Sequence, residues 1–268
     1  MKEKILKWLE STGYPLELFV HKTTIKKGYI CEKSQMYTDI ETGIAREIDL
    51  VAYKNSPHAT KCNYELELLV ECKKSEKPLV VLSNGSEKYE RWNIMLGNEV
   101  VEESYLDTSF AYSHLSDLNP KERSAEIGEF SDLVYSGYSI VPAFGKSDVN
   151  IYKGIMGLSK AAEFFREDHH KMVQTSRKAN IKPERWLRLQ IPVIVVDSLL
   201  FTAYLDERAN LKMVENDWAT IVVRMPWVIG RMDSERLCVI QVVTKSYFER
   251  FLSTVENFHS YISSLKTC

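Results

Sequence analysis

The sequence lacks the features that mark several classes of protein. Its five cysteines show no paired spacing, which argues against a disulfide framework or a zinc site and favours a reducing compartment. No apolar run approaches the roughly 18 residues of a membrane span, and the first residues contain no long apolar stretch typical of a secretory signal. Internal repeats and low-complexity tracts are also missing. We therefore expect a cytoplasmic globular protein that does not associate with membranes.

A strong net charge is missing too, since the formal charge is -2 at pH 7. This small value hides an asymmetry: residues 99–132 carry nine acids against two bases, and residues 153–188 carry nine bases against four acids. A basic segment can bind a phosphate backbone even when the whole chain is nearly neutral. The alternatives are a solvated face or pairing with the acidic segment.

Hydrophobic periodicity predicts an α/β or α+β protein with a mixed sheet. The acidic middle, residues 87–135, indicates helices with loops. Alternation of Glu65 and Glu67 with leucines predicts that one side of their strand faces solvent. The expected helices are 2–10, 16–27, 158–177 and 247–265, and the expected strands are 29–37, 46–53, 64–73, 78–82, 189–201, 219–224 and 237–243.

Two of these apolar strands carry acids at positions where a core strand normally excludes them. Asp49 lies in the run Arg46-Glu47-Ile48-Asp49-Leu50-Val51-Ala52, and Glu71 precedes Lys73 in Leu68-Leu69-Val70-Glu71-Cys72-Lys73-Lys74-Ser75. An unpaired carboxylate in a core is costly, so both acids need a partner, and a divalent cation is a good one. Glu71 and Lys73 share one face of their strand because they are two residues apart. Lys73 is the only lysine with an acid two residues before it.

This grouping suits metal-assisted attack on a phosphodiester. Asp49 and Glu71 would bind Mg²⁺ or Mn²⁺ together with the backbone carbonyl of Cys72, and Lys73 would stabilise charge in the transition state. Glu17, on the preceding helix, could hold a second metal or the attacking water. The simpler alternatives are a strand-end ion pair for Lys73 and a helix-dipole effect for Glu17.

The same residues resemble the motif of the PD-(D/E)xK nuclease superfamily. The resemblance covers about residues 1–110 and rests on Tyr14-Pro15-Leu16-Glu17, Arg46-Glu47-Ile48-Asp49 and Glu71-Cys72-Lys73. It implies a restriction-endonuclease-like α/β fold, a central mixed sheet flanked by helices, and magnesium-dependent cleavage of nucleic acid, usually DNA. Glu17 would be the helix acid, Asp49 and Glu71 the metal ligands and Lys73 the catalytic lysine. Ile48 departs from the motif, because it stands in place of the proline.

The resemblance divides the chain into a nuclease core, residues 1–110, and an α/β C-terminal extension, residues 111–268, packed on that core. Lys74, Lys171, Arg177 and Lys178 are candidates for nucleic-acid binding. Many stand-alone members act in restriction or phage defence and others in repair, and cutting both strands would favour a homodimer or a partner subunit. The alternative function is a catalytically silent module of the same fold that binds nucleic acid or a protein.

Overall fold

The computed structural model describes residues 1–56, 62–85, 87–97, 109–145, 149–178, 185–225 and 237–265. In chain order, its helices are α1 (Lys2–Ser11), α2 (Tyr14–Lys26), α3 (Arg91–Gly97), α4 (Ser109–Asp117), α5 (Pro120–Ile127), the 3-10 helix η1 (Gly128–Ser131), α6 (Val149–Lys178) and α7 (Phe248–Ser264). Its strands are β1 (Ile30–Thr38), β2 (Ala45–Ser56), β3 (Cys62–Lys74), β4 (Leu79–Ser83), β5 (Tyr89–Glu90), β6 (Leu133–Val134), β7 (Ser136–Pro142), β8 (Arg185–Asp197), β9 (Leu200–Leu205), β10 (Leu211–Asn216), β11 (Trp218–Arg224) and β12 (Leu237–Thr244).

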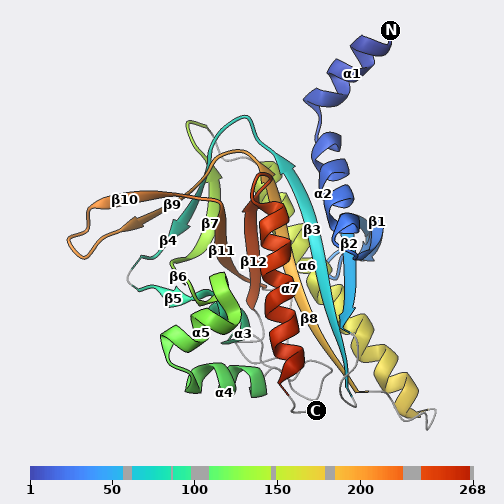
Figure 1. The fold of residues 1–268 in the computed structure, drawn as a ribbon. Coiled ribbons are helices and arrows are strands. Elements are labelled where there is room, and N and C mark those ends of the chain that lie inside the picture. Colours follow the sequence, from blue (N-terminus) through green and yellow to red (C-terminus); the bar gives the residue numbers. More distant parts are fainter. Residues whose placement is uncertain are drawn as a thin grey trace.

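A mixed sheet of ten strands organises the described part of the chain, in the order β1-β2-β3-β8-β12-β11-β7-β4-β9-β10 (Figure 1). The first three strands form an antiparallel meander, and β8 then pairs in parallel with β3 along its whole length. β12 continues in parallel beside β8. Strands from both halves of the sequence therefore share one sheet, and the α/β class with a central mixed sheet flanked by helices is confirmed.

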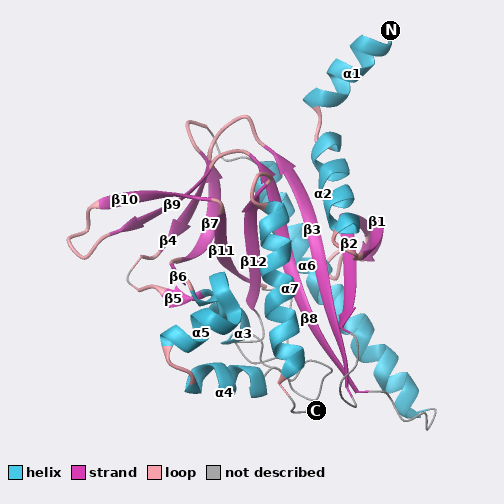
Figure 2. Cartoon of the chain, viewed as in Figure 1, coloured by secondary structure: helices cyan, strands magenta, loops and turns pink. Residues whose placement is uncertain are grey.

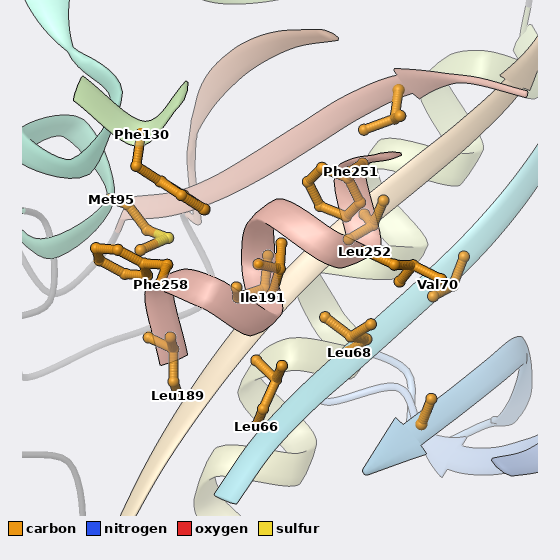
Figure 3. Packing of buried hydrophobic residues seen from close by; sticks show 14 of the residues in the cluster. Leu66, Leu68, Val70, Met95, Phe130, Leu189, Ile191, Phe251, Leu252 and Phe258 are labelled. Atoms are coloured by element: carbon orange, nitrogen blue, oxygen red, sulfur yellow. The ribbon is translucent and has the colours of Figure 1, made fainter. Parts of the chain in front are cut away.

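Helices cover both faces of this sheet (Figure 2). On one face, residues of α2, α3 and α7 form one hydrophobic cluster with the even-numbered leucines of β3, and Figure 3 shows Leu252 of α7 near Leu68 and Met95 of α3 near Phe258. On the other face, α6 packs against Leu69 and Val51. A strand with apolar partners on both sides is expected to be apolar throughout, so any acid within β3 needs a structural or functional reason.

Two sequence predictions fail at defined positions. The apolar run 189–201 was expected to be one strand, but β8 ends at Asp197 and β9 begins at Leu200 in a different part of the sheet, beside β4. Glu65 and Glu67 were expected to face solvent, but they are 8% and 0% exposed because the long helix α6 covers that face of β3. The periodicity of a single strand cannot reveal that a helix from much later in the sequence, α6, will cover one of its faces.

A buried carboxylate in the turn between β1 and β2 binds a lysine of α6. Both oxygens of the fully buried Asp39 accept hydrogen bonds from Lys160 Nζ at 3.0 Å, and Arg46 Nε donates to Oδ2 at 2.6 Å. Burial alone would raise the pKa of Asp39, but these hydrogen bonds lower it to about 2. The Arg46 contact is therefore an ion pair within the hairpin, and it holds the start of β2 in position for Asp49.

None of the helices among the described residues combines the length and the hydropathy required to cross a bilayer.

Candidate active site

The acids of the predicted motif meet where the pairing of β2 and β3 ends. The last residues paired in register are Leu50 and Val70, so continuation of the ladder would place Asp49 opposite Glu71. The ladder stops there because Asp49 Oδ2 accepts the backbone N–H of Cys72 at 2.7 Å. The Asp49 carboxylate thus takes the place of a backbone carbonyl as the acceptor for the Cys72 N–H, and the Asp49 side chain is directed toward the end of β3.

The strand geometry is irregular on both sides of Asp49. Ile48 and Val51 both pack on the α6 face, whereas Leu50 packs on the α2 face, so the usual alternation slips by one residue at this point. Across from Asp49, Ser34 of β1 has a φ of 52°, in the left-handed region that non-glycine residues rarely adopt. Unusual backbone of this kind often accompanies functional sites.

Glu71 and Lys73 form an ion pair on the α6 face of β3. Lys73 Nζ lies 2.5 Å from Glu71 Oε1, and the two side chains are only 25% and 16% exposed, respectively. Gly154 of α6 lies directly above them, since a Cβ added there would fall 2.6 Å from Lys73 Cε. Glycine at this position thus allows α6 to approach β3 without displacing the lysine.

The three predicted acids disfavour one another's ionised forms. Burial and then the charge of Asp49 raise the pKa of Glu71 to about 7, against the lowering effect of Lys73. Burial and then Asp49 raise the pKa of Glu17, and burial raises that of Asp49 although the Cys72 N–H opposes it. Burial would lower the pKa of Lys73, but Glu71 and Asp49 raise it above its usual value. Lys73 thus compensates the acids only in part.

The donor chemistry of this group fits a hard divalent cation. Carboxylates and a backbone carbonyl are the ligands that Mg²⁺ prefers, and a bound cation would relieve the mutual repulsion that raises these pKa values. Among the described residues, however, no three His, Cys, Asp or Glu side chains converge closely enough to hold a metal. Glu71 is engaged by Lys73, so it would have to leave this ion pair to bind a cation.

A cleft of about 260 Å³ opens beside Asp49 on the α2 face of the sheet. Glu17 reaches it from α2, so the helix acid and the strand acid share this space. Sequence reasoning missed the other polar groups of the lining. The lining comprises Leu9, Tyr14, Glu17, Leu18, Val20, His21, Lys33, Ser34, Asp49, Leu50 and Cys72.

His21 could have been found from the sequence, because it lies four residues after Glu17 and therefore on the same face of α2. Lys33 and Ser34 could not, because only the register of β1 on β2 places them near Asp49.

The predicted nucleic-acid-binding residues separate into two groups. Lys74 lies near the acids, where its Nζ donates to the carbonyl of Glu10 at the end of α1 at 2.7 Å. Lys171 is 17 residues beyond Gly154 on α6, which is about 26 Å along a helix. Lys178 is farther still, and Figure 1 shows this end of α6 extending past the start of β3. The side chain of Arg177 and all of residues 179–184 lie outside the described residues.

Comparison of the chain with protein-family models, curated proteins and solved structures gave no match. The functional argument therefore depends on the geometry and chemistry of the residues themselves.

Proposed function

We propose that this protein is a metal-dependent nuclease that hydrolyses phosphodiester bonds in nucleic acid, with DNA as the expected substrate. The observation that carries the proposal is the meeting of Asp49 and Glu71 at the end of β2 and β3, with Lys73 beside them. The acids belong to strands in which an uncompensated carboxylate is costly. Their retention there is understandable if binding a cation is their task.

The arrangement of the strands supports the same proposal. The antiparallel β1, β2 and β3, with a β8 that is parallel to β3 and α6 on one face, are compatible with a restriction-endonuclease-like core into which the segment from β4 to β7 is inserted between β3 and α6. The resemblance to the PD-(D/E)xK motif adds to this support. Restriction, phage defence and repair are the settings that the resemblance suggests.

In the proposed mechanism, Asp49, Glu71 and the carbonyl of Cys72 would hold Mg²⁺ or Mn²⁺ once Glu71 leaves its ion pair with Lys73. A divalent cation there would supply Lewis-acid chemistry, which neutralises phosphate charge and makes water a better nucleophile. Release of Glu71 from its ion pair frees the Lys73 ammonium to stabilise the charge that develops on the phosphate. Glu17, across the cleft, orients the attacking water through its carboxylate.

The direct test is cleavage of supercoiled, linear and single-stranded DNA, and of RNA, in Mg²⁺, Mn²⁺ or EDTA. Removing one group that stabilises transition-state charge typically costs 100-fold or more, on the order of 10²–10³, so Lys73→Ala should lose about this much activity. Lys77→Ala is the matched control, because Lys77 is an exposed lysine in the loop after β3. Metal-independent cleavage, or equal activity of the two variants, would contradict the proposal.

One observation favours a second candidate function, a silent module that binds nucleic acid or protein. The Glu71–Lys73 ion pair satisfies both side chains without a metal, as a purely structural pair would. Such a module would bind nucleic acid or a partner protein but cleave no substrate under any metal condition, so the same assay with a binding measurement distinguishes the two functions.

A further inference from the structure

The cleft beside Asp49 is small compared with the surface that a duplex would need. Its volume of about 260 Å³ lies just below the roughly 300–1,000 Å³ of pockets that enclose drug-sized ligands. A single nucleotide has a volume on that scale, whereas a base pair with both of its strands is larger. Any nucleic acid that reaches Glu17 and Asp49 through this cleft must therefore do so as an unpaired strand.

One edge of the cleft is suited to a base. Tyr14 and Leu18 are one helical turn apart on α2, and they are 52% and 54% exposed. An aromatic ring that is half exposed at the edge of a cleft can stack on any unpaired base, whatever its sequence. Figure 1 shows α2 beside β1 and β2, with α1 extending away from the sheet.

The other edge is suited to a phosphate. Lys33 is exposed and contributes a cation, and Ser34 beside it contributes a hydroxyl. Burial and then the charge of Lys33 lower the pKa of His21, which favours the neutral imidazole, and this form has one N–H to donate. These donors lie in the same cleft as the carboxylates of Glu17 and Asp49.

We propose that this cleft binds one unpaired nucleotide of a single strand or a frayed end, with its base on Tyr14 and its phosphate between His21 and Lys33. A continuous closed duplex is then a poor substrate. The identity of the ligand rests on the proposed nuclease function, but the inference concerns binding and is tested without cleavage.

The test uses the full chain in EDTA, with a fluorescently labelled single-stranded oligonucleotide followed by anisotropy. Two unlabelled competitors are compared, a single strand and a relaxed, covalently closed circular duplex. Per nucleotide, the single strand should displace the labelled oligonucleotide about tenfold more effectively than the duplex. Stacking of one base on an aromatic ring contributes about 1–3 kcal/mol, so Tyr14→Ala should weaken binding about tenfold, whereas Tyr14→Trp should retain it. Tyr138→Ala, which removes a tyrosine of similar exposure (54%) on β7, should bind like the wild type.

A second pair of variants tests the phosphate edge. Lys33→Ala should weaken binding and reduce its dependence on salt, and Lys171→Ala, which removes an exposed lysine from the far part of α6, should change neither. Equal displacement by the closed duplex, unchanged binding by Tyr14→Ala, or the absence of any binding would overturn the inference. Tyr14-dependent binding without metal-dependent cleavage would instead remove the proposed reaction and retain this binding site.

Discussion

Both ends of β3 carry acids, buried at the start and partly buried at the end, and their surroundings differ. At the start of the strand, Arg188 of β8 forms an ion pair with Glu65 and reaches Glu67 at 3.9 Å, and Gln190 Nε2 donates to Glu67 Oε2 at 2.7 Å. At the end of the strand, Glu71 has one cation beside it and further acids nearby. The first group obtains its partners from β8 and from α6, where His169 Nε2 lies 3.5 Å from Glu67 Oε1, whereas the second group includes acids that line a cleft.

This difference separates a structural group of acids from a candidate functional one. A buried acid with an arginine and an amide as neighbours stabilises one arrangement of the strands. Three neighbouring acids with raised pKa values, two of which (Glu17 and Asp49) line a cleft, retain unrelieved repulsion, which a ligand can relieve. Raised pKa values alone do not distinguish them, because burial raises the pKa of Glu67 to about 7 as well.

The largest effect is expected at the structural end. Arg188→Met would leave the carboxylates of Glu65 and Glu67 buried without their cation, and breaking a buried pair in this way costs about 3–5 kcal/mol. Urea unfolding at pH 8 measures this loss. Arg208→Ala, at an exposed turn, should change the free energy of unfolding by less than about 0.5 kcal/mol. An equally small effect of Arg188→Met would show that the acids at this end need no partner.

Activity should respond at the other end. Glu71→Gln keeps the shape of the side chain but removes a charge proposed to bind the cation, so cleavage should fall about 100-fold or more. Stability should change little, because relief of the repulsion from Asp49 offsets the loss of the Lys73 ion pair. Glu76→Gln, at an exposed position just after β3, is the control for activity and for thermal unfolding. A Glu71→Gln variant that unfolds more easily yet still cleaves would reverse the assignment of the two ends.

A smaller effect on activity is expected at Gly154. In Gly154→Ala the new Cβ would lie 2.6 Å from Lys73 Cε, and because this is a flexible part of the lysine, the side chain should move rather than the helix. We expect cleavage to fall about tenfold, the effect of about 1.4 kcal/mol on a barrier, with thermal stability nearly unchanged. Gly157→Ala is the matched control, since its Cβ would lie 3.5 Å from the Tyr37 hydroxyl, an ordinary contact. Equal activities of the two variants would contradict the proposed role of Lys73.

The pH dependence of stability should sharpen the comparison further. The pKa of Glu67 is raised in the folded state to about 7 from an ordinary value of 4.5, so the folded protein binds the extra proton between these values. The contribution of Glu67 to stability is therefore full below about pH 4.5, falls as pH rises toward 7, and is lost above it. Urea unfolding at pH 5 and at pH 8 gives the loss of unfolding free energy between the two pH values, and this loss should be smaller for Glu67→Gln than for the wild type. Equal losses in the two proteins would show that Glu67 does not titrate in this range.

Several elements could be predicted because their signals are local. The helix expected over residues 247–265 is confirmed as α7, and its regularly spaced apolar residues are buried: Phe248, Phe251, Leu252, Val255, Phe258 and Ile262. The helix expected over residues 16–27 is confirmed as α2, with Pro15 in its first turn. The strands that carry Asp49 and Glu71 were also found, because acids within apolar runs are conspicuous.

Other features have no local signal. The break after Asp197 is only two residues long, and apolar residues follow it at once, so β8 and β9 looked like one strand. β10 was missed because its residues are mostly exposed and show no alternating burial.

The sequence by itself determined which residues could do chemistry: Asp49, Glu71 and Lys73 are unusual wherever their strands lie, because ionisable groups in apolar runs need partners. Tertiary structure alone decided which side chains contact these three residues and the other acids of β3. The register of β8 on β3 gives Arg188 to Glu65, and the approach of α6 places Gly154 over Lys73. The register of β1 on β2 then brings Lys33 and Ser34 to the cleft beside Asp49. Such contacts join residues far apart in the chain, and only the packed sheet and helices specify them.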